Sequence, residues 1–138
     1  MTEEGKAGAA SLAAAKQKSL DTLFDYTKFH IGLYLTLTAS YLTAKSANIG
    51  GEPVLSLNPW LAWPAVAAFM LAGLAGGVIA SSITQRVGGS SIEFLADPIG
   101  PWDWKRIHFR ARTWTYIEHT SFWVGLLLAV FSFVPCSA

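Results

Sequence analysis

The residues of this sequence best suited to chemistry are two histidines and a few polar neighbours. His30 and His119 each lie at one end of a long apolar stretch. Two imidazole nitrogens on facing helices can bind the iron of a haem b from opposite sides. Glu118 and His119, together with Asp25 and Tyr26, can also line a polar pocket for the head of a quinone or another amphipathic molecule. The alternative is that these side chains only close the ends of two helices.

Other chemistries lack the residues that they need. The chain has one cysteine, Cys136, so it can form neither an internal disulfide nor a multi-cysteine metal site. It contains no Walker-type phosphate loop, no HExxH zinc pair and no GxSxG nucleophile elbow. The middle of each apolar stretch carries no charged residue, which disfavours a transporter or a pump. We therefore expect no catalytic residue and no metal site.

Three long apolar stretches must position the histidines: Phe29–Ala44, Trp60–Ile83 and His119–Pro135. Each approaches the roughly 20 residues that a helix needs to cross a hydrocarbon core of about 30 Å. In this chain, 52% of the residues are hydrophobic and 14% are charged. In soluble domains, about a quarter of the residues are charged. The sequence therefore predicts an all-α integral membrane protein, a single domain built as a bundle of three transmembrane helices.

The expected segments follow from the ends of these stretches. Residues 11–25 are rich in good helix formers, so an amphipathic helical extension is expected before the first span. Its apolar stripe, Leu12, Leu20, Leu23 and Phe24, can lie on lipid headgroups or on a partner. The predicted order is an N-terminal extension (1–27), a first span (28–45), an outer loop (46–59), a second span (60–83), a cytoplasmic loop (84–117) and a third span (118–136).

Basic residues are concentrated on one predicted side of the membrane. Four lysines precede the first apolar stretch, and five lysines or arginines lie between the second and third stretches. Only Lys45 lies between the first and second stretches, and no basic residue follows the third. Because lysine and arginine favour cytoplasmic loops, the distribution predicts a plasma membrane protein, in bacteria the inner membrane, with its N-terminus in the cytoplasm and its C-terminus outside.

A basic aromatic segment before the third span predicts a helix that lies on the membrane surface. Asp103 can cap such a helix, and apolar residues follow at intervals of three and four. Basic side chains between them can reach the phosphates of anionic lipids, so nucleic acid is not needed to explain them. The residues expected at this lipid or partner interface are Trp104, Lys105, Arg106, Ile107, Arg110, Arg112 and Trp114.

Small residues mark the second span for helix packing. They recur every three or four positions, and a second row lies beside the first. Small side chains allow helix backbones to approach closely in lipid. We expect the second span at the centre of the bundle, packed on both neighbours or on another copy. The residues of the two rows are Ala65, Ala68, Ala72, Gly73, Gly76, Gly77 and Ala80.

The number of expected spans and the chain length resemble the three-helix membrane-anchor subunits of succinate dehydrogenase and fumarate reductase. This resemblance implies a membrane subunit that binds a haem or a quinone. Haem-bearing members of that group carry a histidine in the second span, and residues 60–83 contain none. The sequence therefore departs from the group at the position that would bind haem.

Three functions remain open. The leading expectation is a non-catalytic accessory or scaffold subunit of a larger membrane complex, whose partners are lipids and other membrane subunits. The second is a haem- or quinone-binding electron-transfer anchor subunit built around His30 and His119. The third is a homo-oligomeric pore or membrane-disrupting effector, in which copies associate through Ala68, Ala72 and Gly76.

Overall fold

A computed structural model of the chain describes residues 3–49, 51–55, 57–86, 89–101 and 107–134. Most of these residues are helical, so the prediction of an all-α protein is confirmed. Two antiparallel pairs of two-residue strands accompany the helices, β1 with β2 and β3 with β4. The elements are, in chain order, α1 (Glu3–Ser46), β1 (Asn48–Ile49), β2 (Glu52–Pro53), α2 (Pro59–Thr84), α3 (Ser91–Ala96), β3 (Pro98–Ile99), β4 (Phe109–Arg110) and α4 (Ala111–Phe131).

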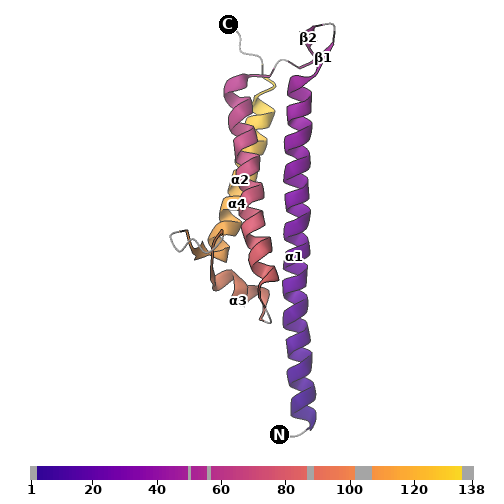
Figure 1. Cartoon of the computed structure of the whole chain (residues 1–138), viewed down its shortest axis with the longest axis vertical. Coiled ribbons are helices and arrows are strands. Elements are labelled where there is room, and N and C mark those ends of the chain that lie inside the picture. Colours follow the sequence, from indigo (N-terminus) through magenta and orange to yellow (C-terminus); the bar gives the residue numbers. More distant parts are fainter. Residues whose placement is uncertain (1–2, 50, 56, 87–88, 102–106, 135–138) are drawn as a thin grey trace.

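The three long helices stand side by side, and α1 extends far beyond the other two (Figure 1). Helices α1 and α4 run in one direction, and α2 runs back in the other. The backbone of α2 approaches both α1 and α4 closely, whereas α1 and α4 meet mainly through their side chains. Helix α2 is therefore the central element of the bundle.

Buried positions recur every seven residues in each long helix. A seven-residue repeat keeps one narrow stripe against a neighbour when helices wind around each other with a slight left-handed twist. Several of the buried positions in this repeat hold polar side chains or glycine instead of the usual leucine or valine. The complete set of repeat positions is Leu20, Thr27, Tyr34 and Tyr41 from α1, Ala62, Phe69, Gly76 and Ile83 from α2, and Ala111, Glu118, Gly125 and Ser132 from α4 and its C-terminal cap.

The small residues of α2 pack inside this bundle. Ala65, Ala72 and Gly76 are buried, whereas Ala68, Gly73, Gly77 and Ala80 are partly exposed. A Cβ added at Gly76 would lie 3.0 Å from Ile31 Cγ1 of α1 and 3.5 Å from a carboxylate oxygen of Glu118 in α4. The first small row therefore brings both neighbouring helices of the same chain close to α2.

Helix α1 joins the expected N-terminal extension to the expected first span. It continues without a break from Glu3 to Ser46, and residues 21–30 contain no glycine or proline that would interrupt it. At 1.5 Å per residue, this helix is about 66 Å long. The expected apolar stripe does not lie flat on a surface: Leu20 is 1% exposed and packs in the bundle core, whereas Leu12 is 61% exposed.

The described part of the segment before α4 does not form the predicted surface helix. Trp104, Lys105 and Arg106 lie outside the described residues. Strand β4 follows Ile107 and pairs with β3, and Ala111 already begins α4. Trp114 belongs to the first turns of α4, where it is buried and donates a hydrogen bond from Nε1 to the Ile99 carbonyl at 3.0 Å. The apolar stripe of this segment therefore faces protein instead of lipid.

Among the described helices, one is long and apolar enough by its length and composition to cross a membrane, and this helix is α2. Within its most apolar window, 44% of the residues are buried in the bundle. Helices α1 and α4 are more polar, because they carry the tyrosines, threonines and histidines of the helix interfaces.

Candidate functional site

Polar side chains connect α1 to α4 along the length of the bundle. The hydroxyl of Tyr34 donates a hydrogen bond to Glu118 Oε1 at 3.0 Å, and the Tyr26 hydroxyl lies 3.3 Å from His119 Nε2. Near the other end of the bundle, Tyr41 and Ser132 share a hydrogen bond between their hydroxyls. We call this set the polar seam; its members are Tyr26, His30, Tyr34 and Tyr41 from α1 and Glu118, His119 and Ser132 from α4 and its cap.

The structure brings the two predicted histidines together. The ring centroids of His30 and His119 lie 6.0 Å apart. Each Nδ1 lies 2.9 Å from the backbone carbonyl oxygen four residues earlier, at Tyr26 and Thr115 respectively. A carbonyl oxygen only accepts, so each Nδ1 carries a hydrogen and each neutral ring keeps Nε2 as its acceptor. The Nε2 of His119 then accepts a hydrogen bond from the Tyr26 hydroxyl.

Glu118 is the buried carboxyl group of the seam, with 2% of the residue exposed. None of the ion pairs within the described residues involves it, and Tyr34 is its hydrogen-bond partner. A buried carboxyl group without a partner is costly, so this hydrogen bond stabilises the local structure. Gly76 of α2 lies beside the carboxyl group, and a Cβ added there would be 3.5 Å from Glu118 Oε1. Gly76 is therefore both a packing residue and a wall of the seam.

The seam suits a haem poorly. Tyr26 occupies Nε2 of His119, and the Tyr26 ring centroid lies 4.0 Å from that of His30. A haem iron bound by both histidines requires that Tyr26 moves away. Within the described residues, no group of three or more histidine, cysteine, aspartate or glutamate side chains is placed to hold a metal ion.

The predicted polar pocket is only partly assembled. Tyr26, Glu118 and His119 belong to the seam, whereas Asp25 is exposed and forms no polar contact with the seam in the described part of the chain. The seam offers hydroxyl and imidazole groups at its Tyr26 end, where Tyr26 is 48% exposed. A small polar head group can reach this end without displacement of the buried pair of Tyr34 and Glu118.

Tyr34, Tyr41 and Ser132 were not predicted as seam residues. Tyr34 and Tyr41 are seven residues apart and continue the spacing of Leu20 and Thr27. That seven-residue repeat is the signal from which they can be found. A hydropathy pattern does not reveal it, because three of its four positions are polar.

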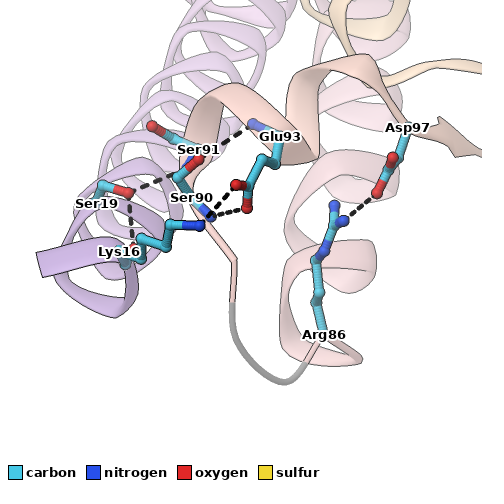
Figure 2. A network of polar contacts seen from close by, with 7 residues as sticks. All are labelled: Lys16, Ser19, Arg86, Ser90, Ser91, Glu93 and Asp97. Atoms are coloured by element: carbon cyan, nitrogen blue, oxygen red, sulfur yellow. Dashed lines mark hydrogen bonds and ion pairs between the residues drawn. The ribbon is translucent and has the colours of Figure 1, made fainter. Parts of the chain in front are cut away.

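A second polar network joins α1 to α3 and holds the end of α2 (Figure 2). Lys16 Nζ lies 2.8 Å from Glu93 Oε1, and the Ser91 backbone donates a hydrogen bond to Ser19 Oγ at 3.0 Å. Glu93 also accepts a hydrogen bond from the backbone of Ser90, which closes a capping box at the start of α3. The hydrogen bonds from Lys16 and from the Ser90 backbone hold the pKa of Glu93 below its usual value of 4.5.

The two arginines predicted at a lipid interface lie beside the start of α4. Arg110 and Arg112 are exposed, and both line an open depression between α3 and α4. Arg112 donates hydrogen bonds from Nε and Nη2 to the Tyr116 hydroxyl at 3.2 and 2.9 Å. Ile107, predicted at the same interface, is half-buried and packs on the core instead.

Comparisons of the chain with protein-family models, with curated proteins and with solved structures find no match. The resemblance to three-helix anchor subunits gains no support from them.

Proposed function

We propose that this protein is a three-span membrane protein that acts as a non-catalytic accessory or scaffold subunit of a larger membrane complex. The observation that carries the proposal is the distribution of polar and apolar side chains. The buried polar side chains pair between α1 and α4, whereas large apolar side chains are exposed on the outer faces of all three long helices. Phe29, Leu74 and Trp123 are 68%, 67% and 59% exposed.

This distribution is favourable in lipid. Soluble monomers rarely expose large contiguous apolar surfaces, whereas in a bilayer the same side chains contact acyl chains. Lipid also offers no hydrogen bonds, so polar groups inside a membrane protein must pair with each other. The pairs Tyr34–Glu118 and Tyr41–Ser132 meet this requirement.

The dimensions and the ends of the bundle support the same proposal. The 21 residues of α4 correspond to about 30 Å, which matches a hydrocarbon core. Trp60 and Trp63, near the start of α2, are 85% and 58% exposed, and Lys45 Nζ lies 4.3 Å above the Trp63 ring. Tryptophan and lysine at this level are typical of a membrane–water interface.

The accessory role is supported by what the chain leaves exposed. All side chains from Ala7 to Ala15 are exposed, and this part of α1 projects past the bundle (Figure 1). From Glu3, the projection is about 20 Å long. In the proposed orientation it stands in the cytoplasm, where a rigid helix can contact another subunit of the complex.

A second candidate is a quinone-binding electron-transfer subunit. The observation that favours it is the meeting of His30 and His119 beside the half-exposed Tyr26. Solvent extraction of the purified protein followed by chromatography detects a bound quinone, and an absorption spectrum detects haem by its Soret band. The pore alternative is weaker, because Ala72 and Gly76 are already packed against helices of the same chain.

Membrane integration and orientation are tested with the natural cysteine. We expect the protein to remain in the membrane pellet after a carbonate wash, and a membrane-impermeant maleimide added to intact cells to label Cys136. The control is Ala13→Cys in a Cys136→Ser background, which should react only after the cells are permeabilised. Release by carbonate, or the opposite labelling pattern, would contradict the proposal.

The accessory role has its own test. Purification in a mild detergent should recover the protein together with larger membrane subunits. Removal of the projecting residues 3–15 should reduce this association while the protein stays in the membrane. A protein that is purified alone from native membranes, under conditions that preserve other complexes, would refute the accessory role.

A further inference from the structure

We propose that the depression between α3 and the start of α4 binds the phosphate group of an anionic phospholipid such as phosphatidylglycerol. The proposal rests on the proposed membrane location and adds a specific lipid site to it. Apolar side chains of α3, Ile92 and Leu95, form one wall of the depression. Arg110, Arg112 and Tyr116 form the opposite wall.

The two arginines are the available positive charges of this surface. Neither Arg110 nor Arg112 forms an ion pair with an acid in the described part of the chain. Lys16 and Arg86, at the same end of the molecule, are paired with Glu93 and Asp97. An anion that enters the depression therefore meets two guanidinium groups that need not leave a carboxylate partner.

The guanidinium group of Arg112 is already held in place. Its Nε and Nη2 atoms donate to the Tyr116 hydroxyl, and its Cζ lies 5.5 Å from the Tyr116 ring centroid. Among the described residues, no acceptor pairs with Nη1 or with the second hydrogen of Nη2, so both can donate to phosphate oxygens. A planar guanidinium group forms paired hydrogen bonds with phosphate, so a fixed orientation lowers the entropy cost of binding.

The apolar wall distinguishes a lipid from a free anion. Ile92 is 80% exposed beside the depression, and Leu95 is half-buried. An acyl chain or glycerol backbone gains contacts with these side chains, whereas inorganic phosphate gains none. A site with two arginines on one wall and aliphatic side chains on the other therefore fits an amphipathic anion.

The position in the fold agrees with this ligand. Helix α3 and the start of α4, whose side chains line the depression, lie at the end of the bundle where α2 ends (Figure 1). In the proposed orientation this end faces the cytoplasm, where anionic headgroups attract basic side chains. The exposed ring of Tyr116 sits at the same level, as aromatic side chains do at a membrane interface.

The test measures lipid binding to the purified full chain in a neutral detergent. We expect saturable binding of short-chain phosphatidylglycerol in a titration, about tenfold tighter than that of phosphatidylcholine with the same chains. The double variant Arg110→Gln/Arg112→Gln should lose at least about tenfold in affinity, since each basic residue near a lipid surface contributes roughly fivefold. The matched control Lys28→Gln, on α1 and outside the depression, should bind as the natural chain does.

Three results would overturn the site. They are equal affinity for the two lipids, unchanged affinity in the double variant when circular dichroism shows that it is folded, and displacement of the lipid by an equal concentration of inorganic phosphate. The carbonate wash shows whether the lipid site alone is refuted or the membrane location is refuted as well. A protein that stays in the membrane without a preference for phosphatidylglycerol loses only the lipid site, whereas a protein that is washed off loses both.

Discussion

At the scale of single residues, the buried pair of Tyr34 and Glu118 is the most sensitive point of the bundle. Glu118 has this one side-chain partner within the described residues, and both groups are almost fully buried. Replacement Tyr34→Phe leaves the carboxyl group without its donor. We expect a loss of about 1–3 kcal/mol in unfolding free energy, measured by thermal or denaturant unfolding in detergent.

Tyr41→Phe is the matched control for this prediction. The Ser132 hydroxyl also donates to the Ala129 carbonyl at 2.6 Å, so it keeps a partner when the Tyr41 hydroxyl is removed. The control should therefore cost clearly less than Tyr34→Phe. Equal losses in the two variants would show that the carboxyl group of Glu118 does not depend on Tyr34.

Gly76 and Gly73 provide a second comparison within one helix. A Cβ at position 76 would stand 3.0 Å from Ile31 Cγ1, which is tighter than an ordinary van der Waals contact, whereas a Cβ at position 73 meets nothing within 4 Å. Gly76→Ala should destabilise the protein by about 1–3 kcal/mol through overpacking. Gly73→Ala should be neutral or stabilising by up to about 1 kcal/mol, because alanine favours the helix.

The same unfolding measurement in detergent checks this comparison. A Gly76→Ala protein as stable as Gly73→Ala would mean that α1 and α4 do not approach α2 at this position. The helices around the buried seam would then be packed too loosely to press on an added methyl group.

At the scale of elements, the docking of α3 on α1 should depend on pH. The folded pKa of Glu93 is lowered, first by the hydrogen bond from Lys16 and then by that from the Ser90 backbone. A lowered pKa means that the carboxylate supports the folded arrangement at neutral pH. This support is lost as the pH falls below the usual value of 4.5 and through the folded pKa.

Hydrogen exchange of the backbone amides in residues 91–96 measures this docking. Protection corrected for the intrinsic exchange rate should decrease as the pH falls below 4.5. The variant Lys16→Gln should show lower protection at neutral pH and a weaker pH dependence. Identical profiles for the variant and the natural chain would contradict a role for the contact between Lys16 and Glu93.

The elements also show what the sequence could and could not predict. The helical class and the central place of α2 were predictable, because apolar and small residues dominate α2 from end to end. Ile107, Ala111 and Trp114 form an apolar stripe that fits a lipid surface and a protein core equally well. Long-range contacts decide between them: the Asp97 carbonyl accepts from the Ala111 amide at 2.8 Å, and the backbone at Gly100 passes too close to the Ile107 carbonyl for a Cβ.

The candidate site was predictable in the same partial way. His30, Glu118 and His119 were found because they stand at the ends of apolar stretches. The pairing of Glu118 with Tyr34 was not predicted. These two residues are 84 positions apart in sequence, and their contact depends on how α1 and α4 are shifted along their axes relative to each other. The periodicity within one helix carries no information on that shift.

At the scale of the whole molecule, the bundle encloses a few paired polar groups within an apolar core and also exposes large apolar side chains on its outer faces. Tyr34 and Glu118 are buried, whereas Leu35, Leu74 and Leu127 are 62%, 67% and 56% exposed on the outer faces of α1, α2 and α4. In a bilayer these leucines contact acyl chains. Among the described helices, α2 is the one candidate span by length and composition, so the decisive positions are those on α1 and α4.

Spin labels at these three leucines show whether the outer faces of α1, α2 and α4 all lie in lipid. Each leucine is replaced by cysteine in a Cys136→Ser background, labelled and reconstituted into lipid vesicles, and its collisions with oxygen and with a water-soluble nickel chelate are measured. The account predicts that all three labels are accessible to oxygen and shielded from the chelate. Free access of the chelate to the label at Leu35 or Leu127 would contradict a bundle that crosses the membrane three times.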